Sequence, residues 1–171
     1  LANLVDNGIE INIIRGNHDM WMYDYLPKEI GVNILEDKTI LSENGKQIFL
    51  AHGDGLGPGD KGYKRMKFIL SNPFFIWMFK LIHPDIGISL GKYFSQKNKL
   101  ISGEKDLSFK GEENEWLIRY CKRKLDKEHI DYFIFGHRHL PITHSLKNKS
   151  KYINLGDWIS HYTYGVFDGK N

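Results

Sequence analysis

Three short polar clusters each follow directly after an apolar run of strand-forming residues, and this pattern constrains the fold more than any other feature. The clusters are Gly16-Asn17-His18-Asp19, His52-Gly53-Asp54 and Gly136-His137-Arg138-His139. The carboxyl ends of strands are where α/β folds assemble their sites. A glycine in each cluster lets the backbone turn sharply or lets a ligand come close. The pattern therefore predicts one polar site at the ends of several strands.

The apolar periodicity predicts strands on both sides of these clusters. We expect single strands at 9–14, 32–35 and 131–135, a hairpin of 39–43 and 46–51, and three short strands within 142–167 with turns at 147–150 and 156–157. Asn44-Gly45 is a strong signal for the hairpin turn. Strands that alternate with helices and end in a β-rich segment indicate a layered α/β or α-β-β-α domain.

Helices are expected between these strands. The segments are the end of a helix at 1–8, a short piece at 20–30, helices across 63–94 with breaks at Asn72-Pro73 and His83-Pro84, and one helix at 112–129. Leu117, Cys121 and Leu125 form the buried stripe of the last helix, which has acids in its first turn and bases in its last turn. The polar segment 95–110 is expected to be a loop.

The composition suits one ordinary domain in a reducing compartment. The 171 residues are 41% apolar, which is enough for a core. Cys121 is the single cysteine and cannot form an internal disulfide, which predicts a reducing compartment. No secretory leader opens the chain, and no apolar run reaches the roughly 20 residues that span a bilayer. Because the chain starts without Met and inside a helical pattern, we expect further sequence upstream.

The middle third of the chain is cationic and aromatic. Residues 61–99 hold eight lysines and arginines against one acid, Asp85, so their net charge is +7, while the whole chain carries +3. Residues 68–82 are too apolar for an exposed surface helix and too short and broken to span a membrane. They suit the interface of an anionic membrane or a lining for acyl chains. Plain core packing is the alternative. A nucleic-acid surface is disfavoured because the aromatic residues are clustered and rich in Phe.

The polar clusters contain the donors of a metal site. Imidazoles and an amide oxygen suit manganese, iron or zinc. His137 and His139 are two residues apart, so in a loop they can diverge to two adjacent ions. Asp54 or Asp157 could orient ligand imidazoles, or simply cap turns. Each cluster taken separately is also compatible with an ordinary turn, but the three together favour a metal site.

These clusters resemble the third, fourth and fifth sequence blocks of the calcineurin-like metallophosphoesterases. The resemblance implies that Asn17, His52 and His137 bind one metal and that His139 binds the other. It implies that His18 stabilises charge at the scissile phosphate and protonates the leaving oxygen, with Asp19 orienting its ring. The cofactors would be two divalent ions, manganese with iron or zinc as alternatives. Two such ions neutralise phosphate oxygens and activate a water, and a histidine is a suitable acid.

A narrower resemblance is to the UDP-2,3-diacylglucosamine pyrophosphohydrolases of lipid A synthesis. It is carried by His52-Gly53-Asp54, Asp60-x-Gly62-Tyr63, the broken apolar helices, Gly136-His137-x-His139-x-Pro141 and Leu155-Gly156-Asp157-Trp158. It implies hydrolysis of a lipid-linked nucleotide sugar, UDP-2,3-diacylglucosamine, to UMP and 2,3-diacylglucosamine 1-phosphate. Asp60 and Tyr63 would contact substrate, and Lys97, Asn98 and Lys99 would lie near its phosphate and sugar.

The resemblance also implies an architecture and a location. Residues 1–62 and 108–171 would form part of a four-layer α-β-β-α sandwich, and 63–107 would be a helical cap that holds the acyl chains. The protein would lie on the cytoplasmic side of the inner membrane, without nucleic-acid partners. Its oligomeric state is left open.

Two departures from the family pattern accompany the match. The Asp-x-His block and the Gly-Asp block with the bridging Asp, both upstream in the family, do not occur at matching places here. We therefore expect this stretch to be inactive alone and the full-length protein to supply both blocks. His18 stands where the narrower family often has Arg. Two other functions stay open: a metallophosphoesterase with a soluble phosphodiester or phosphomonoester substrate, and a non-catalytic scaffold with this fold.

Overall fold

The computed structural model describes residues 1–57, 61–102, 108–109 and 111–169, with the backbone alone for 94–102. Its strands are β1 (Asn12–Ile14), β2 (Asn33–Leu35), β3 (Lys38–Glu43), β4 (Lys46–Ala51), β5 (Tyr132–Phe135), β6 (Pro141–Ser145) and β7 (Lys151–Leu155). Its helices are α1 (Ala2–Asp6), α2 (Tyr25–Ile30), α3 (Lys61–Leu70), α4 (Pro73–Lys80), α5 (Pro84–Ser102) and α6 (Trp116–Leu125), with a 3₁₀ turn at Lys147–Lys149. The architecture is a mixed α/β fold, as the sequence predicted.

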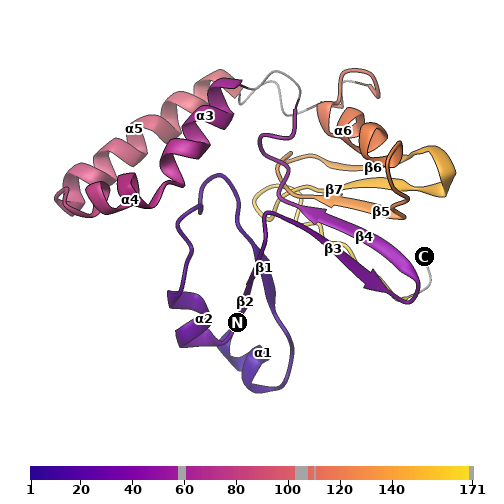
Figure 1. Cartoon of the computed structure of the whole chain (residues 1–171), viewed down its shortest axis with the longest axis horizontal. Helices are drawn as coiled ribbons and strands as arrows, with labels where there is room; N and C mark the ends of the chain where they lie inside the picture. Colours follow the sequence, from indigo (N-terminus) through magenta and orange to yellow (C-terminus); the bar gives the residue numbers. More distant parts are fainter. Residues whose placement is uncertain (58–60, 103–107, 110, 170–171) are drawn as a thin grey trace.

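The strands form two sheets (Figure 1). The larger sheet has the order β3-β4-β5-β7-β6, in which β4, β5 and β7 are parallel and both edge strands are antiparallel to their neighbours. The smaller sheet pairs β1 and β2 in parallel. The loops that follow β4 and β5 therefore leave the same edge of the larger sheet, and both carry predicted site residues.

The hydrophobic core lies between α6 and one face of the larger sheet. Leu117 and Cys121 are fully buried, and Leu125 is nearly so, which confirms the predicted stripe of this helix. Alternate residues of β5, Phe133 and Phe135, point into the same core. Burial of these side chains holds α6 across the strands whose ends carry the site.

Two predicted turns are confirmed in the structure. The hairpin pairs Glu43 with Lys46, and both residues between them have positive φ, 48° at Asn44 and 75° at Gly45. Such angles suit the right-handed twist of a two-residue hairpin. The break before α4 also lies where expected: the Asn72 side chain accepts a hydrogen bond from the backbone N–H of Phe74, and Pro73 occupies the first turn.

Other boundaries differ from the prediction. The polar segment 95–110 was expected to be a loop, but α5 continues to Ser102, because polar residues such as these are as compatible with an exposed helix as with a loop. The last helix is confined to Trp116–Leu125 and has no acid in its first turn. Only two strands, not three, form within 142–167, because the segment after Gly156 turns around the carboxylate of Asp157.

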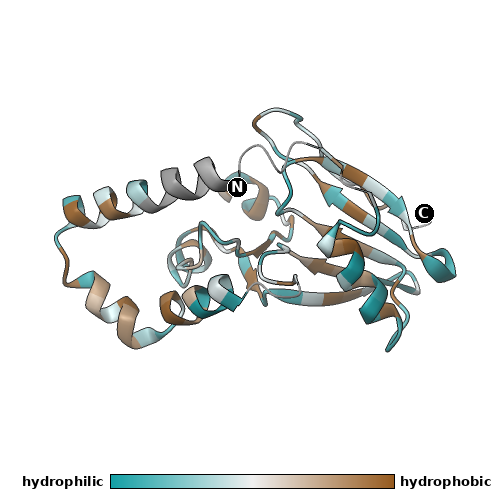
Figure 2. Cartoon of the chain, turned by 90° about the horizontal axis from the view of Figure 1, so that it is seen from above, coloured by the Kyte–Doolittle hydropathy of each residue, from teal (hydrophilic) through white to brown (hydrophobic). Residues whose placement is uncertain are grey.

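Helices α3, α4 and α5 extend from the loop after β4 and stand to one side of the sheets (Figure 1). Coloured by hydropathy, they carry brown apolar segments along much of their described length (Figure 2). Large apolar side chains on α4 are exposed, Phe74 and Trp77 among them. No helix in the described part of the chain is both long enough and apolar enough to cross a membrane.

Candidate active site

The loops after β4 and β5 are tied together by their backbones. β4 and β5 are parallel and end at the same level, with Ala51 opposite Phe135. The carbonyl oxygen of His52 accepts hydrogen bonds from the backbone N–H groups of Gly136, at 3.0 Å, and His137, at 2.8 Å. The register of two neighbouring strands therefore brings together two histidines that are 85 residues apart.

Three predicted ligand atoms meet at one point. The Nε2 atom of His52 lies 2.9 Å from Oδ1 of Asn17 and 3.3 Å from Nδ1 of His137. Asn17 comes from the loop after β1, so the point joins the smaller sheet to the larger one. Each of these atoms can offer a lone pair.

Small residues permit this approach. A Cβ on Gly53 would lie 3.0 Å from Cβ of His137, and the φ of Gly53 is +118°. A Cβ on Gly16 would lie 3.0 Å from Cε1 of the His52 ring. Larger residues at these two positions would push the three ligand loops apart, which explains why glycine stands beside the predicted clusters.

The donor set fits a single divalent cation. Ligand atoms about 2.1 Å from one ion and at right angles to each other are about 3 Å apart, close to the separations found here. Burial lowers the pKa of His52, against the opposing effects of Asp54 and Asp19, and so favours the neutral imidazole that can bind a metal. Within the described residues no group of three or more His, Cys, Asp or Glu side chains surrounds one point. The donors that converge here are two imidazoles and the amide oxygen of Asn17.

His18 and Asp19 follow Asn17 in the same turn, and both are exposed. The carboxylate of Asp19 accepts a hydrogen bond from the backbone N–H of Gly16 and so closes this turn. His18 is near enough to His52 to contribute to its electrostatic environment. The turn leaves the His18 ring accessible beside the three converging donors. The orienting effect of Asp19 on this ring stays a prediction.

His139 has different neighbours from His137. Its side chain is 60% exposed, and its Nδ1 atom lies 3.6 Å from Oδ2 of Asp157. His161 approaches the same oxygen, also at 3.6 Å. The Oδ1 atom of Asp157 accepts backbone hydrogen bonds from residues 159, 160 and 161, which hold the pKa of this carboxyl well below its usual range. Asp157 therefore stays ionised beside His139.

Arg138 separates the two histidines because its own side chain points inward. Its guanidinium is buried and lies 2.6 Å from Oε2 of Glu115, the residue that precedes α6. The side-chain amide of Asn154 donates to the backbone carbonyls of Arg138 and Leu140, which holds the loop against β7. Sequence reasoning missed these three supporting residues. The one signal in the sequence was a charged residue, Arg138, between two histidines that follow an apolar strand.

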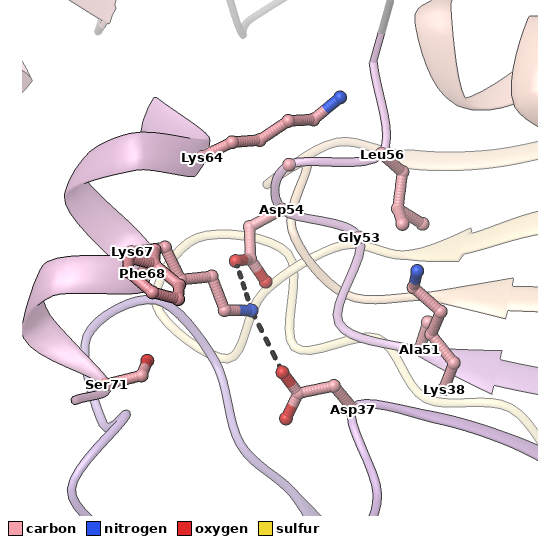
Figure 3. A pocket seen from close by; sticks show the side chains of 11 residues that line it. Asp37, Lys38, Ala51, Gly53, Asp54, Leu56, Lys64, Lys67, Phe68 and Ser71 are labelled. Atoms are coloured by element: carbon pink, nitrogen blue, oxygen red, sulfur yellow. Dashed lines mark hydrogen bonds and ion pairs between the residues drawn. The ribbon is translucent and has the colours of Figure 1, made fainter. Parts of the chain in front are cut away.

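Asp54 has a different role from the predicted orientation of an imidazole. Its buried carboxylate accepts hydrogen bonds from Tyr63, at 2.5 Å, and Lys67, at 2.9 Å, both on α3. Burial alone would raise the pKa of Asp54, but these two hydrogen bonds lower it. Lys67 also pairs with Asp37 at 3.1 Å (Figure 3). Tyr63, predicted to contact substrate, is thus held beside the ligand loop.

The other predicted substrate residues are only partly described. Asp60 lies outside the described residues. The backbone of Lys97, Asn98 and Lys99 is helical, in the second half of α5, but their side chains are not described. Their contacts with substrate stay predictions.

The fold and the site define an α/β protein whose polar centre lies at the carboxyl ends of parallel strands, where enzymes of this class carry their active sites. No family model matches the chain. The UDP-2,3-diacylglucosamine hydrolase of Porphyromonas gingivalis is 35% identical to it over 99% of the chain and 69% of the relative. The chain therefore belongs to the UDP-2,3-diacylglucosamine hydrolase family, which confirms the narrower resemblance.

More distant relatives carry the same name. The protein of Aliivibrio fischeri is 28% identical over 92% of the chain and 65% of the relative. The protein of Pseudomonas putida is 26% identical over 92% of the chain and 65% of the relative. The chain thus spans about two thirds of the length of the curated relatives it matches.

Proposed function

We propose that this protein hydrolyses the pyrophosphate bond of UDP-2,3-diacylglucosamine to UMP and 2,3-diacylglucosamine 1-phosphate, in lipid A biosynthesis. The observation that carries this proposal is the convergence of Asn17, His52 and His137 at the strand ends, within 2.9 and 3.3 Å. The names of the relatives support the choice of substrate.

The reaction would use two divalent ions, of manganese, or alternatively of iron or zinc. Asn17, His52 and His137 would hold one ion, and His139, backed by Asp157, would contribute to the other. When bound, such ions neutralise phosphate oxygens and lower the pKa of a bound water to a value near neutrality. The lowered pKa of His52 supports this assignment, because a neutral imidazole is the form that binds a metal.

The chain's own groups would bind the phosphates and handle a proton. His18 is exposed on the turn beside the donors, so its imidazole can reach the oxygen that leaves with one product and protonate it. Tyr63 would present its ring to substrate while its hydroxyl stays on Asp54. Asp60, Lys97, Asn98 and Lys99 complete the proposed substrate-binding set.

The finer architecture is part of the same proposal. Residues 1–62 and 108–171 would form part of a four-layer α-β-β-α metallophosphoesterase core, without its upstream strands. Residues 63–107 would form a cap inserted after the second ligand loop. The run of three helices between that loop and α6 supports this division.

The lipid part of the substrate would bind to the cap. Many of its large apolar side chains are exposed: Phe68, Phe74, Phe75, Trp77, Met78, Leu81, Ile82, Ile86, Ile88 and Leu90. So much exposed apolar surface on helices that also carry a net positive charge suits acyl chains and an anionic bilayer surface. The protein would therefore act peripherally, on the cytoplasmic side of the inner membrane.

The test is cleavage of UDP-2,3-diacylglucosamine by the complete protein, with manganese and a trace of detergent. We expect UMP release that a chelator abolishes. Cleavage of a water-soluble aryl phosphodiester with no UMP release would favour a soluble substrate. No activity on either compound would favour a non-catalytic scaffold.

A further inference from the structure

Three cavities follow one another from the inner side of α3 to α4. The first, of about 380 Å³, is lined by Gly53 and Asp54 of the loop after β4. The second, of about 220 Å³, reaches Gly16 beside Asn17. The third, of about 260 Å³, is lined by Ile76 and Trp77 of α4.

Shared residues connect the three cavities. Ser71, just after α3, lines all three cavities, and Lys67 lines the first two. Tyr23 lines the second and the third. The three cavities therefore adjoin one another and form a hollow from the loops after β1 and β4 to the apolar residues of α4. Lys67 lies in its first two parts.

Lys67 joins three separate segments of the chain. Its Nζ atom lies 2.9 Å from Oδ2 of Asp54, after β4, and 3.1 Å from Oδ2 of Asp37, between β2 and β3 (Figure 3). The side chain of Asp54 is only 4% exposed and that of Lys67 26%. This pair is therefore shielded from water more than an ordinary surface ion pair, which contributes little.

The charges around Lys67 are balanced. Arg15 also reaches Asp37, with Nη2 and Oδ1 3.5 Å apart, so two cations face two carboxylates. Tyr63, one helical turn before Lys67, donates to the same oxygen of Asp54. Tyr63 and Lys67 of α3 are thus matched to groups fixed on the core rather than to solvent.

A second contact anchors the other end of α3. The indole Nε1 of Trp21 donates to the backbone carbonyl of Leu70 at 2.7 Å, and its ring packs edge-on against Phe79 at 4.7 Å. Trp21 stands three residues after His18 in the chain. A shift of α3 would therefore alter both the hollow and the loop that carries the candidate acid.

We propose that Lys67 is a positioning residue, which fixes α3 on the ligand loops and so sets the shape of the hollow between the phosphate site and the apolar helices. This proposal rests on the proposed function, since it assigns the hollow to a substrate with a phosphate at one end and acyl chains at the other. Lys67 acts through Asp54 and Asp37 and does not touch the reacting atoms.

The test compares Lys67→Met with two other variants in the complete protein. Arg65→Met is the matched control, because it removes the same charge from an exposed position on the same helix. Lys67→Arg keeps a cation within reach of both carboxylates. The two readouts are amide hydrogen exchange in residues 61–70 and the steady-state constants for substrates with long and short acyl chains.

For Lys67→Met we expect faster exchange in α3 and a KM about tenfold higher for the long-chain substrate, the loss typical of one charge-assisted hydrogen bond. The kcat and the KM for a short-chain substrate should change much less. Arg65→Met should give the same exchange rates and KM values as the wild-type protein. Lys67→Arg should return the KM for the long-chain substrate most of the way to the wild-type value.

Unchanged exchange in Lys67→Met would overturn the anchoring role, whatever the kinetics. Faster exchange with an unchanged KM would overturn the positioning role. An equal loss for long-chain and short-chain substrates would assign Lys67 to the phosphate site instead. If the wild-type protein releases no UMP, the proposed function fails, and the positioning role fails with it. The exchange comparison then still decides the anchoring, because it needs no substrate.

Discussion

The guanidinium of Arg138 and the carboxylate of Glu115 form a buried ion pair, with Nη1 and Oε2 2.6 Å apart. Because Arg138 stands between His137 and His139 in the chain, this pair holds the backbone of the loop that carries both imidazoles. Glu115 directly precedes α6, so the core helix and the histidine loop are held by one contact.

Breaking this pair on one side should destabilise the fold strongly. Arg138→Met removes the guanidinium that lies against the buried Glu115 carboxylate, and we expect a loss of about 3–5 kcal/mol in the free energy of unfolding. Arg119→Met, on the exposed side of α6, should change it by less than about 0.5 kcal/mol. Urea denaturation measures both, and equal midpoints for the two variants would contradict the account.

Protonation of Asp131 should contribute to the loss of folding stability in acid. Burial would raise the pKa of Asp131, but hydrogen bonds from the backbone N–H of Gln47 and from Lys46 lower it. The contribution of Asp131 is therefore complete above the ordinary aspartate pKa of about 3.9 and is lost as the pH falls through its lowered value.

Asp131→Asn should accordingly lower the stability near pH 7 and flatten its decline below about pH 4. Denaturant titrations across this pH range measure the effect. Asp85→Asn is the control, because its carboxylate is 87% exposed and should leave the pH profile unchanged. If Asp131→Asn loses stability in acid as steeply as the wild-type protein does, the role given to this carboxylate is contradicted.

Two Gly→Ala substitutions should act in opposite directions. Gly45 has a φ of +75° in the hairpin turn, and Gly91 lies within α5, yet an added Cβ would meet no atom within 4 Å at either position. Gly45→Ala should cost about 1 kcal/mol through backbone strain, whereas Gly91→Ala should gain about 0.5–1 kcal/mol. Thermal unfolding of the two variants gives the comparison, and a shift of the same sign in both would contradict it.

The sequence predicted the parts of the fold and site that follow from local patterns. The hairpin at Asn44-Gly45, the helix break at Pro73 and the stripe of Leu117 are set by backbone angles and apolar spacing. The meeting of Asn17, His52 and His137 was expected because each follows a strand. The turn, the helix break and the stripe need only neighbouring residues, and His52 and His137 need only the common end of two parallel strands.

Long-range polar contacts could not be predicted in this way. The pairings of Arg138 with Glu115 and of Lys67 with Asp54 and Asp37 join residues that have no fixed spacing in the chain. The length of α5 was also missed, because polar residues are equally compatible with an exposed helix and a loop. Such choices are decided by packing in three dimensions rather than by local propensity.

In the proposed mechanism, the histidines of this chain divide between metal binding and acid catalysis. The direct measurement is metal content together with UMP release for His18→Ala and His137→Ala in the complete protein. His18→Ala should keep its manganese and lose about 10²–10⁴-fold in kcat, while His137→Ala should lose metal and activity together. Loss of metal from His18→Ala, or full metal content in an inactive His137→Ala, would contradict the account.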